Sequence, residues 1–172
     1  MKTWRTRPLA WQGFGRSEEG VTALEFALVA PMVIALMIGV LQIGVLELMS
    51  TNLDLAVTRT TRKILTGAAD RPASAAAFEE AICGVMVDAR DKCRERLAIS
   101  VQKAADFAAG EAVANAQPTG QYDIGGPGSL ILVRATYRWP LILPIYAGGF
   151  RLSGPTEAVI DARAVFRNEP YA

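Results

Sequence analysis

A long apolar run dominates the first third of the chain. From Phe26 to Leu46 the sequence reads FALVAPMVIALMIGVLQIGVL, and its only strongly polar residue is Gln42. A helix over this run would be roughly 30 Å long, which matches the hydrocarbon core of a bilayer. A cleaved secretory signal has a shorter apolar region and a small-residue cleavage site, which the following residues 47–50 do not supply. The pattern predicts a retained transmembrane helix over 21–46.

The apolar pattern continues beyond this run at helical spacing. Its positions recur about every 3.5 residues, and charged residues fall largely on other sides of the helix. Gly67 then provides a stop signal. We therefore predict one helix from Val21 to Thr66, roughly 70 Å long. Its second half would face either a partner or the protein's own soluble domain through Leu46, Met49, Leu53, Val57 and Ile64.

A second, shorter helix is expected after the linker that begins at Asp70. Ser74 can cap its first turn. The amphipathic positions that predict this helix are Phe78, Ile82, Val85, Met86 and Ala89.

The character of the chain changes beyond Cys93. Strand patterns cover 97–101, 130–139 and 158–166, and the Gly- and Pro-rich segment 122–129 indicates a loop. Residues 107–116 fit neither pattern. Because helices come first and strands later, the order predicts an α+β fold. We expect a long N-terminal helix, a short helix and a small antiparallel sheet.

The charges before the apolar run suggest how the chain is oriented. Residues 1–20 carry four basic residues against Glu18 and Glu19, and a basic excess marks the cytoplasmic side of a membrane segment. We therefore expect a cytoplasmic leader over 1–20 and a transmembrane helix over 21–46. The periplasmic or extracellular domain would cover 47–172 and include the helix continuation to about residue 66.

The composition argues against several classes of function. The chain has no histidine, which removes the commonest general base and metal ligand. Its formal net charge is +1, so no broad field attracts nucleic acid. The segment Gly125–Gly128 lacks the phosphate-loop pattern, and no spacing pairs a nucleophile with a base. We expect no enzyme activity, no cofactor, no metal and no nucleic-acid partner.

The two cysteines could form a disulfide if their domain lies outside the cytoplasm. A continuous helix would hold Cys83 and Cys93 about 15 Å apart, beyond disulfide reach. Pairing therefore requires the second helix to end near residues 89–92 and the chain to turn back. Such a short loop would stabilise the fold by about 2–3 kcal/mol. Two unpaired thiols are the alternative.

Two short stretches resemble a known family. The first is GVTALEFALVAP over 20–31, in which a glycine at the charge boundary is followed by a lone carboxylate, Glu25. The second is the ending RNEPY over 167–171. Both resemble the TadE family of pilus assembly proteins, which are minor pilin-like components of Tad (Flp) pilus systems.

The resemblance implies cleavage by a prepilin peptidase between Gly20 and Val21, after which the helix stays on the mature protein. Glu25 would then take an assembly role. One helical turn, about 6 Å, separates it from the new α-amine of Val21, so it could pair with that amine or with the amine of a neighbouring subunit. The alternative is an interfacial carboxylate that only marks the end of the membrane helix. The implied partners are the peptidase, other Tad pilus components, pilin subunits and the lipid bilayer. The implied functions are pilus biogenesis and adhesion.

The same resemblance implies a bacterial inner-membrane protein with a cytoplasmic N-terminus and a periplasmic C-terminal domain, which could enter the extracellular pilus. An uncleaved, signal-anchored periplasmic binding or interaction domain is the alternative. A membrane-tethered enzyme is disfavoured because no catalytic constellation is visible.

Overall fold

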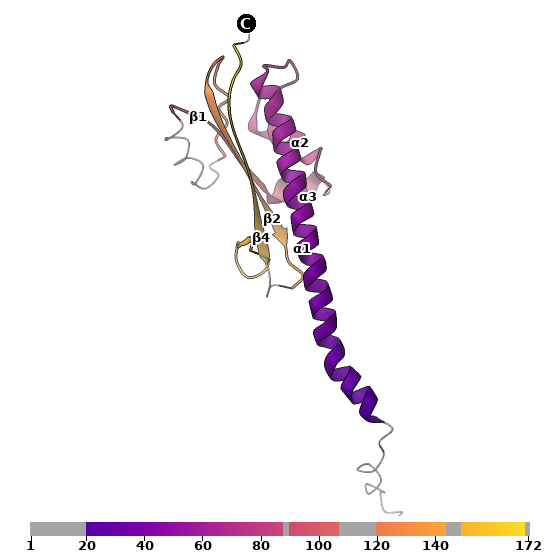
Figure 1. Ribbon diagram of the computed structural model, residues 1–172. Helices are drawn as coiled ribbons and strands as arrows, with labels where there is room; N and C mark the ends of the chain where they lie inside the picture. The colour runs from indigo at the N-terminus through magenta and orange to yellow at the C-terminus, as the bar shows by residue number, and fades with distance from the viewer. Residues whose placement is uncertain (1–19, 88–89, 107–119, 144–148, 171–172) are drawn as a thin grey trace, which may run out of the picture. The chain divides into compact units, whose positions relative to one another are not determined.

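The computed structural model describes residues 20–87, 90–106, 120–143 and 149–170. Within these ranges the α+β prediction is confirmed, because the helices precede an antiparallel sheet (Figure 1). The chain divides into two compact units between Met37 and Ile38. The elements are α1 (Val21–Leu65), α2 (Ala75–Cys83), α3 (Arg90–Arg96), β1 (Leu97–Ala104), β2 (Leu130–Pro140), β3 (Arg151–Leu152) and β4 (Glu157–Arg167).

The first part of α1 exposes apolar side chains on every side. All residues from Val21 to Val29 are exposed, and Phe26 reaches 73%. In the part of the chain that the structure describes, α1 is the one helix long and apolar enough to cross a membrane. A helix that is apolar all round needs lipid or other protein around it.

The second part of α1 packs onto the sheet of its own domain. Its first buried side chain is Gln42, and the stripe predicted from the sequence is buried from Leu46 to Ile64. This stripe therefore faces the domain, which excludes the partner-facing alternative for these residues. The buried residues of α1 are Gln42, Leu46, Met49, Leu53, Ala56, Val57, Thr60, Thr61 and Ile64.

The end of α1 confirms the predicted stop signal. Gly67 adopts a positive φ of 65°, a conformation that glycine reaches without a Cβ penalty. Its N–H donates to the carbonyl of Ile64 (3.1 Å), and the N–H of Ala68 donates to that of Lys63 (3.0 Å). These two bonds form a Schellman motif, which satisfies carbonyls that the helix end would otherwise leave open.

The second helix begins as predicted but ends earlier. Ser74 caps it, because its side chain accepts a hydrogen bond from the backbone N–H of Ala77 (3.2 Å). The expected continuation through Val85 and Met86 is wrong, since α2 ends at Cys83 and the chain turns after Gly84. Amphipathic spacing alone did not reveal this break. Ala89, the last predicted position, lies outside the described residues.

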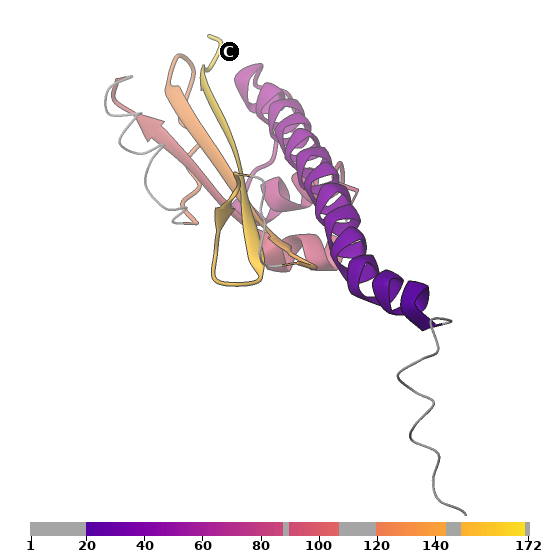
Figure 2. The same ribbon diagram turned by 60° about the horizontal axis from the view of Figure 1, so that its bottom comes forward.

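The four strands found in the described ranges form one antiparallel sheet in the order β1-β2-β4-β3. The three predicted strands are confirmed, each slightly longer than expected. The two-residue β3 was not predicted, because so short a segment carries no pattern. The ambiguous segment 107–116 lies outside the described residues. Figure 2 shows the long β2 and β4 side by side.

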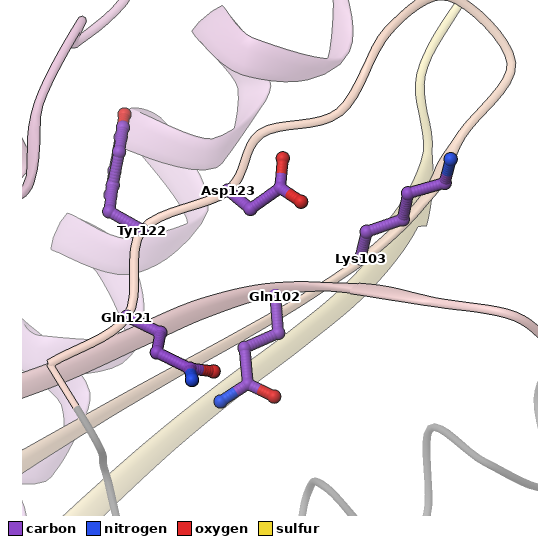
Figure 3. A pocket seen from close by; sticks show the side chains of 5 residues that line it. All are labelled: Gln102, Lys103, Gln121, Tyr122 and Asp123. Atoms are coloured by element: carbon purple, nitrogen blue, oxygen red, sulfur yellow. The ribbon is translucent and has the colours of Figure 1, made fainter.

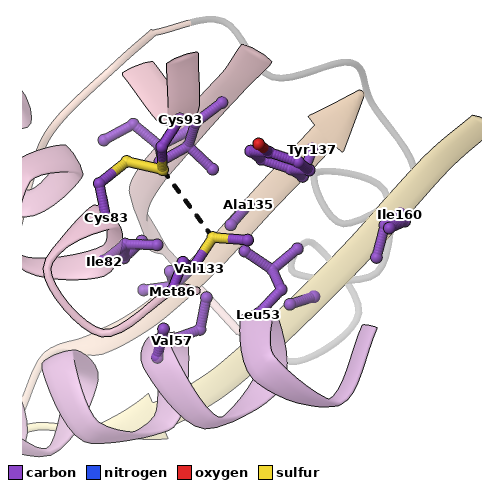
Figure 4. Packing of buried hydrophobic residues seen from close by; sticks show 14 of the residues in the cluster. Leu53, Val57, Ile82, Cys83, Met86, Cys93, Val133, Ala135, Tyr137 and Ile160 are labelled. Carbon is purple, nitrogen blue, oxygen red and sulfur yellow. Dashed lines mark hydrogen bonds between the residues drawn. A yellow bond between two sulfur atoms is a disulfide. The ribbon is translucent and has the colours of Figure 1, made fainter. Parts of the chain in front are cut away.

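The core lies between one face of this sheet and the helices. Alternate residues of β2 point inward, and Tyr137 is the largest fully buried side chain. Figure 4 shows how Leu53 and Val57 of α1 approach β2 and Ile160 of β4, with Ile82 of α2 on the same side. The helices and strands are thus held together by one shared apolar cluster.

Candidate functional site

The predicted processing position lies at the start of α1. Gly20 immediately precedes the helix and is exposed, and Val21 is its first residue with 48% exposure. A Cβ built at Gly20 would meet no atom within 4 Å. Folding therefore places no demand for glycine at this position, and a requirement for it would have to come from another molecule.

Glu25 lies on α1 one helical turn beyond Val21, and it is exposed. It is the only charged residue of α1 before Glu47. The helix brings residues 21 and 25 onto one face at a rise of about 6 Å. The structure thus places the carboxylate where an amine on Val21 could reach it, although in the uncleaved chain that nitrogen is a peptide group.

The two cysteines are joined in the structure. The Cα atoms of Cys83 and Cys93 lie 5.8 Å apart, and their sulfur atoms form a disulfide. Both side chains are buried, and the sulfur of Met86 lies 3.9 Å from that of Cys93 (Figure 4). The bond ties the end of α2 to α3 across the turn that replaces the expected helix. Its role is therefore structural.

Gln42 clamps the loop that follows β2. Its Oε1 accepts hydrogen bonds from the backbone N–H groups of Ile142 and Leu143, at 2.8 Å each. Its Nε2 donates to the carbonyl oxygen of Leu143 at 3.0 Å. The side chain is 5% exposed, so these bonds satisfy an amide that burial would otherwise destabilise. In the sequence Gln42 stands out as the only strongly polar residue of the apolar run, but nothing there indicates which groups it binds.

The chain ending has a structural role that spacing did not reveal. Asn168 is 2% exposed, and its Nδ2 donates to the carbonyl oxygens of Ile124 (2.9 Å) and Gly126 (3.1 Å). The backbone N–H of Glu169 donates to the carbonyl of Leu65 at 3.0 Å. This ending therefore holds the glycine-rich loop and the C-terminal end of α1 together.

An ionic cluster lies on the other face of the sheet, around Asp161. Its carboxylate accepts hydrogen bonds from Thr136 (2.7 Å) and Arg134 (3.2 and 3.3 Å), forms an ion pair with Arg151, and lies 3.9 Å from Arg163. Desolvation raises the pKa of Asp161, but the Thr136 bond and the arginine charges outweigh it, so the pKa is lowered. The cluster holds a charge in place and offers no base near neutral pH.

One open depression, with a volume of about 370 Å³, borders β1 (Figure 3). Polar side chains line it: Gln102, Lys103, Gln121, Tyr122 and Asp123. Burial raises the pKa of Tyr122 to about 12, against the charge of Arg71, and its hydroxyl donates to the carbonyl of Pro72 at 2.6 Å. The phenol is therefore protonated and engaged at neutral pH. Among the described residues, no group of three or more His, Cys, Asp or Glu side chains could hold a metal.

Over the residues that the structure describes, these features define a protein with one candidate membrane helix, whose second half carries a small α+β domain. The family described as TadE-like protein has a model that matches residues 20–62. The chain is thus similar to that family across most of α1, and the resemblance of its first stretch is confirmed. The match does not include 167–171, so the resemblance of the ending stays a prediction. No curated protein and no solved structure matches the chain.

Proposed function

We propose that this protein is a minor pilin-like structural component of a Tad (Flp) pilus, processed by a prepilin peptidase between Gly20 and Val21. One coincidence supports this proposal most. The TadE-like match begins at residue 20, α1 begins at Val21, and Gly20 is exposed. A membrane peptidase could therefore reach the bond without unfolding the helix.

The exposed apolar surface of α1 supports an assembly role after processing. Its side chains from Val21 to Leu41 are mostly exposed, and lipid or neighbouring helices can cover such a surface equally well. The helix could then leave the bilayer by exchanging lipid contacts for contacts with other subunits. The α+β domain would remain on the periplasmic side and serve pilus biogenesis and adhesion.

Glu25 would set the register of that assembly. Cleavage frees an α-amine on Val21, and an unpaired charge in an apolar environment is costly. The carboxylate of Glu25 can pair with the amine of its own chain or of a neighbouring subunit. Either pairing favours one axial position of the helix over others.

N-terminal sequencing of the protein from its native host tests the processing step. The mature chain should begin at Val21, and Gly20→Val should leave the Met1 form uncut. Gly44→Val is the matched control, because position 44 is also exposed and a Cβ there meets no atom within 4 Å. Persistence of the Met1 form while the pilus machinery is active would support the uncleaved interaction domain instead.

A second substitution tests the assembly role. Glu25→Ala should still insert into the membrane and be cleaved, but surface pili should fall at least about tenfold, the factor that corresponds to about 1.4 kcal/mol of lost pairing. Glu47→Ala is the control, since Glu47 is an exposed carboxylate of the same helix beyond the apolar run. Equal pilus production by both variants would refute the pairing role.

A further inference from the structure

The loop after β2 carries an exposed apolar residue beside the clamp. Leu141 is 8% exposed and belongs to the core, whereas Ile142 is 76% exposed. Gln42 fixes the backbone on both sides of the Ile142–Leu143 peptide bond through three hydrogen bonds to these two residues. Because this stretch of backbone is fixed, the side chain of Ile142 is held in an exposed position.

The helix surface next to this clamp is also apolar. Val40 is 63% exposed, Leu41 68% and Val45 39%. No charged residue of α1 lies between Glu25 and Glu47. The loop therefore meets α1 within the uncharged stretch of the helix that is the candidate membrane span.

The position of the clamp along α1 matches the edge of a bilayer. Gln42 precedes the first following charge, Glu47, by five residues, which corresponds to about 7.5 Å of helix. The headgroup region on each side of a bilayer is about 5–7 Å thick. If Glu47 lies in water, Gln42 lies near the boundary of the hydrocarbon. At that depth unsatisfied polar groups are costly, and the clamp satisfies both its own amide and the loop backbone.

We propose that Gln42 holds the Leu141–Leu143 loop in the membrane interface on the side of the sheet domain, with Ile142 inserted at the boundary between headgroups and acyl chains. The domain then touches the bilayer at a second point beside α1. Gln42 ties the exposed Ile142 to a segment of α1 whose neighbouring residues Val40, Leu41 and Val45 are also apolar and exposed, which favours lipid as the occupant. The proposal rests on α1 spanning the bilayer and not on cleavage.

Tryptophan fluorescence in lipid vesicles tests the proposal. The full chain with Trp4, Trp11 and Trp139 replaced by Phe is the background, and its far-UV circular dichroism and disulfide are compared with those of the unchanged protein. Vesicles of phosphatidylcholine and phosphatidylglycerol carry bromine at shallow or deep acyl positions. Ile142→Trp should lose about twofold in intensity with shallow bromine and less with deep bromine, because interfacial groups lie about 5–10 Å into the headgroup–acyl boundary.

Two probes calibrate this measurement. Leu36→Trp, at the centre of the apolar run, should be quenched most by deep bromine. Val165→Trp should be unaffected, because Val165 is 48% exposed and pairs with Leu132, far along β4 from the loop. A Leu36→Trp probe without quenching would overturn the membrane span itself, independently of the pilus function.

The role of Gln42 has its own test. Adding Gln42→Leu to the Ile142→Trp chain should reduce its quenching to the level of Val165→Trp. Adding Gln42→Leu to the Leu36→Trp chain should leave the quenching of that probe unchanged. Unchanged quenching would overturn the positioning role. If Ile142→Trp is not quenched in lipid but shifts to the blue with protein concentration, a second copy of the chain covers the loop and the lipid proposal fails.

Discussion

Loss of the Asp161 carboxylate should destabilise the sheet through the buried Arg134. The side chain of Arg134 is 4% exposed and that of Asp161 is 17% exposed, so the pair is largely removed from water. Asp161→Asn keeps the size of the side chain but removes the carboxylate that accepts hydrogen bonds from the buried guanidinium. Breaking a buried ion pair in this way costs about 3–5 kcal/mol, and the residual exposure of Asp161 favours the lower end, about 3 kcal/mol.

Equilibrium denaturation of the full chain in detergent micelles, followed by near-UV circular dichroism, measures this change in the free energy of unfolding. Arg163→Ala is the control on the same strand. Arg163 is 42% exposed and lies 3.9 Å from the same carboxylate, so its loss should cost less than about 1 kcal/mol. If Asp161→Asn is no more destabilising than this control, the buried pair does not stabilise the domain as we argue.

A compensating variant separates the pair from other effects at the site. Arg134→Met combined with Asp161→Leu removes both charges and replaces them with apolar side chains. Such replacements are often neutral or stabilising, so the double variant should recover most of the loss of Asp161→Asn. A double variant at least as unstable as Asp161→Asn would show that the loss did not come from breaking this ion pair.

The same carboxylate predicts how stability depends on pH. The pKa of Asp161 is lowered in the folded protein from its ordinary value of 3.8. Between the folded pKa of Asp161 and 3.8, the folded state therefore binds fewer protons than the unfolded state. The contribution of Asp161 is fully present above about pH 4 and is lost as the pH falls through its folded pKa. Asp161→Asn should flatten the stability curve in this acid range.

Three further predictions concern the structural contacts. Asn168→Ala removes two buried hydrogen bonds and should lower the free energy of unfolding by about 2–3 kcal/mol, whereas Glu169→Ala, which keeps its backbone bond to Leu65, should change it little. Reduction of the disulfide, whose cysteines are separated by 10 residues, should cost about 2–3 kcal/mol in denaturation, and the double Cys→Ala variant should not respond to reductant. Tyr122→Phe loses the bond to Pro72 and should cost about 1 kcal/mol by the same measurement.

The end of α1 could be predicted from the sequence because the residues that stop this helix are close together in the chain. The stop of α1 at Gly67 depends on hydrogen bonds to Ile64 and Lys63, all within a few residues, so the glycine was readable in the sequence. The end of α2 was not readable in this way. The apolar positions Val85 and Met86 keep helical spacing, and Met86 is indeed buried. Met86 is buried after a turn and not as part of a helix, because the disulfide brings Cys93 back towards α2.

The hydrogen bonds of Gln42 and Asn168 show why long-range contacts cannot be predicted from local sequence patterns. Hydropathy registers what it costs to move Gln42 from water into an apolar environment, but the actual cost depends on Leu143, which lies 101 residues away. Spacing likewise gives no reason for Asn168 to reach Ile124, 44 residues earlier. Because the amide of Gln42 is satisfied by the loop, it can lie near lipid without an unpaired polar group. The one strongly polar residue of the apolar run is therefore the first buried contact along α1 between the helix and the α+β domain.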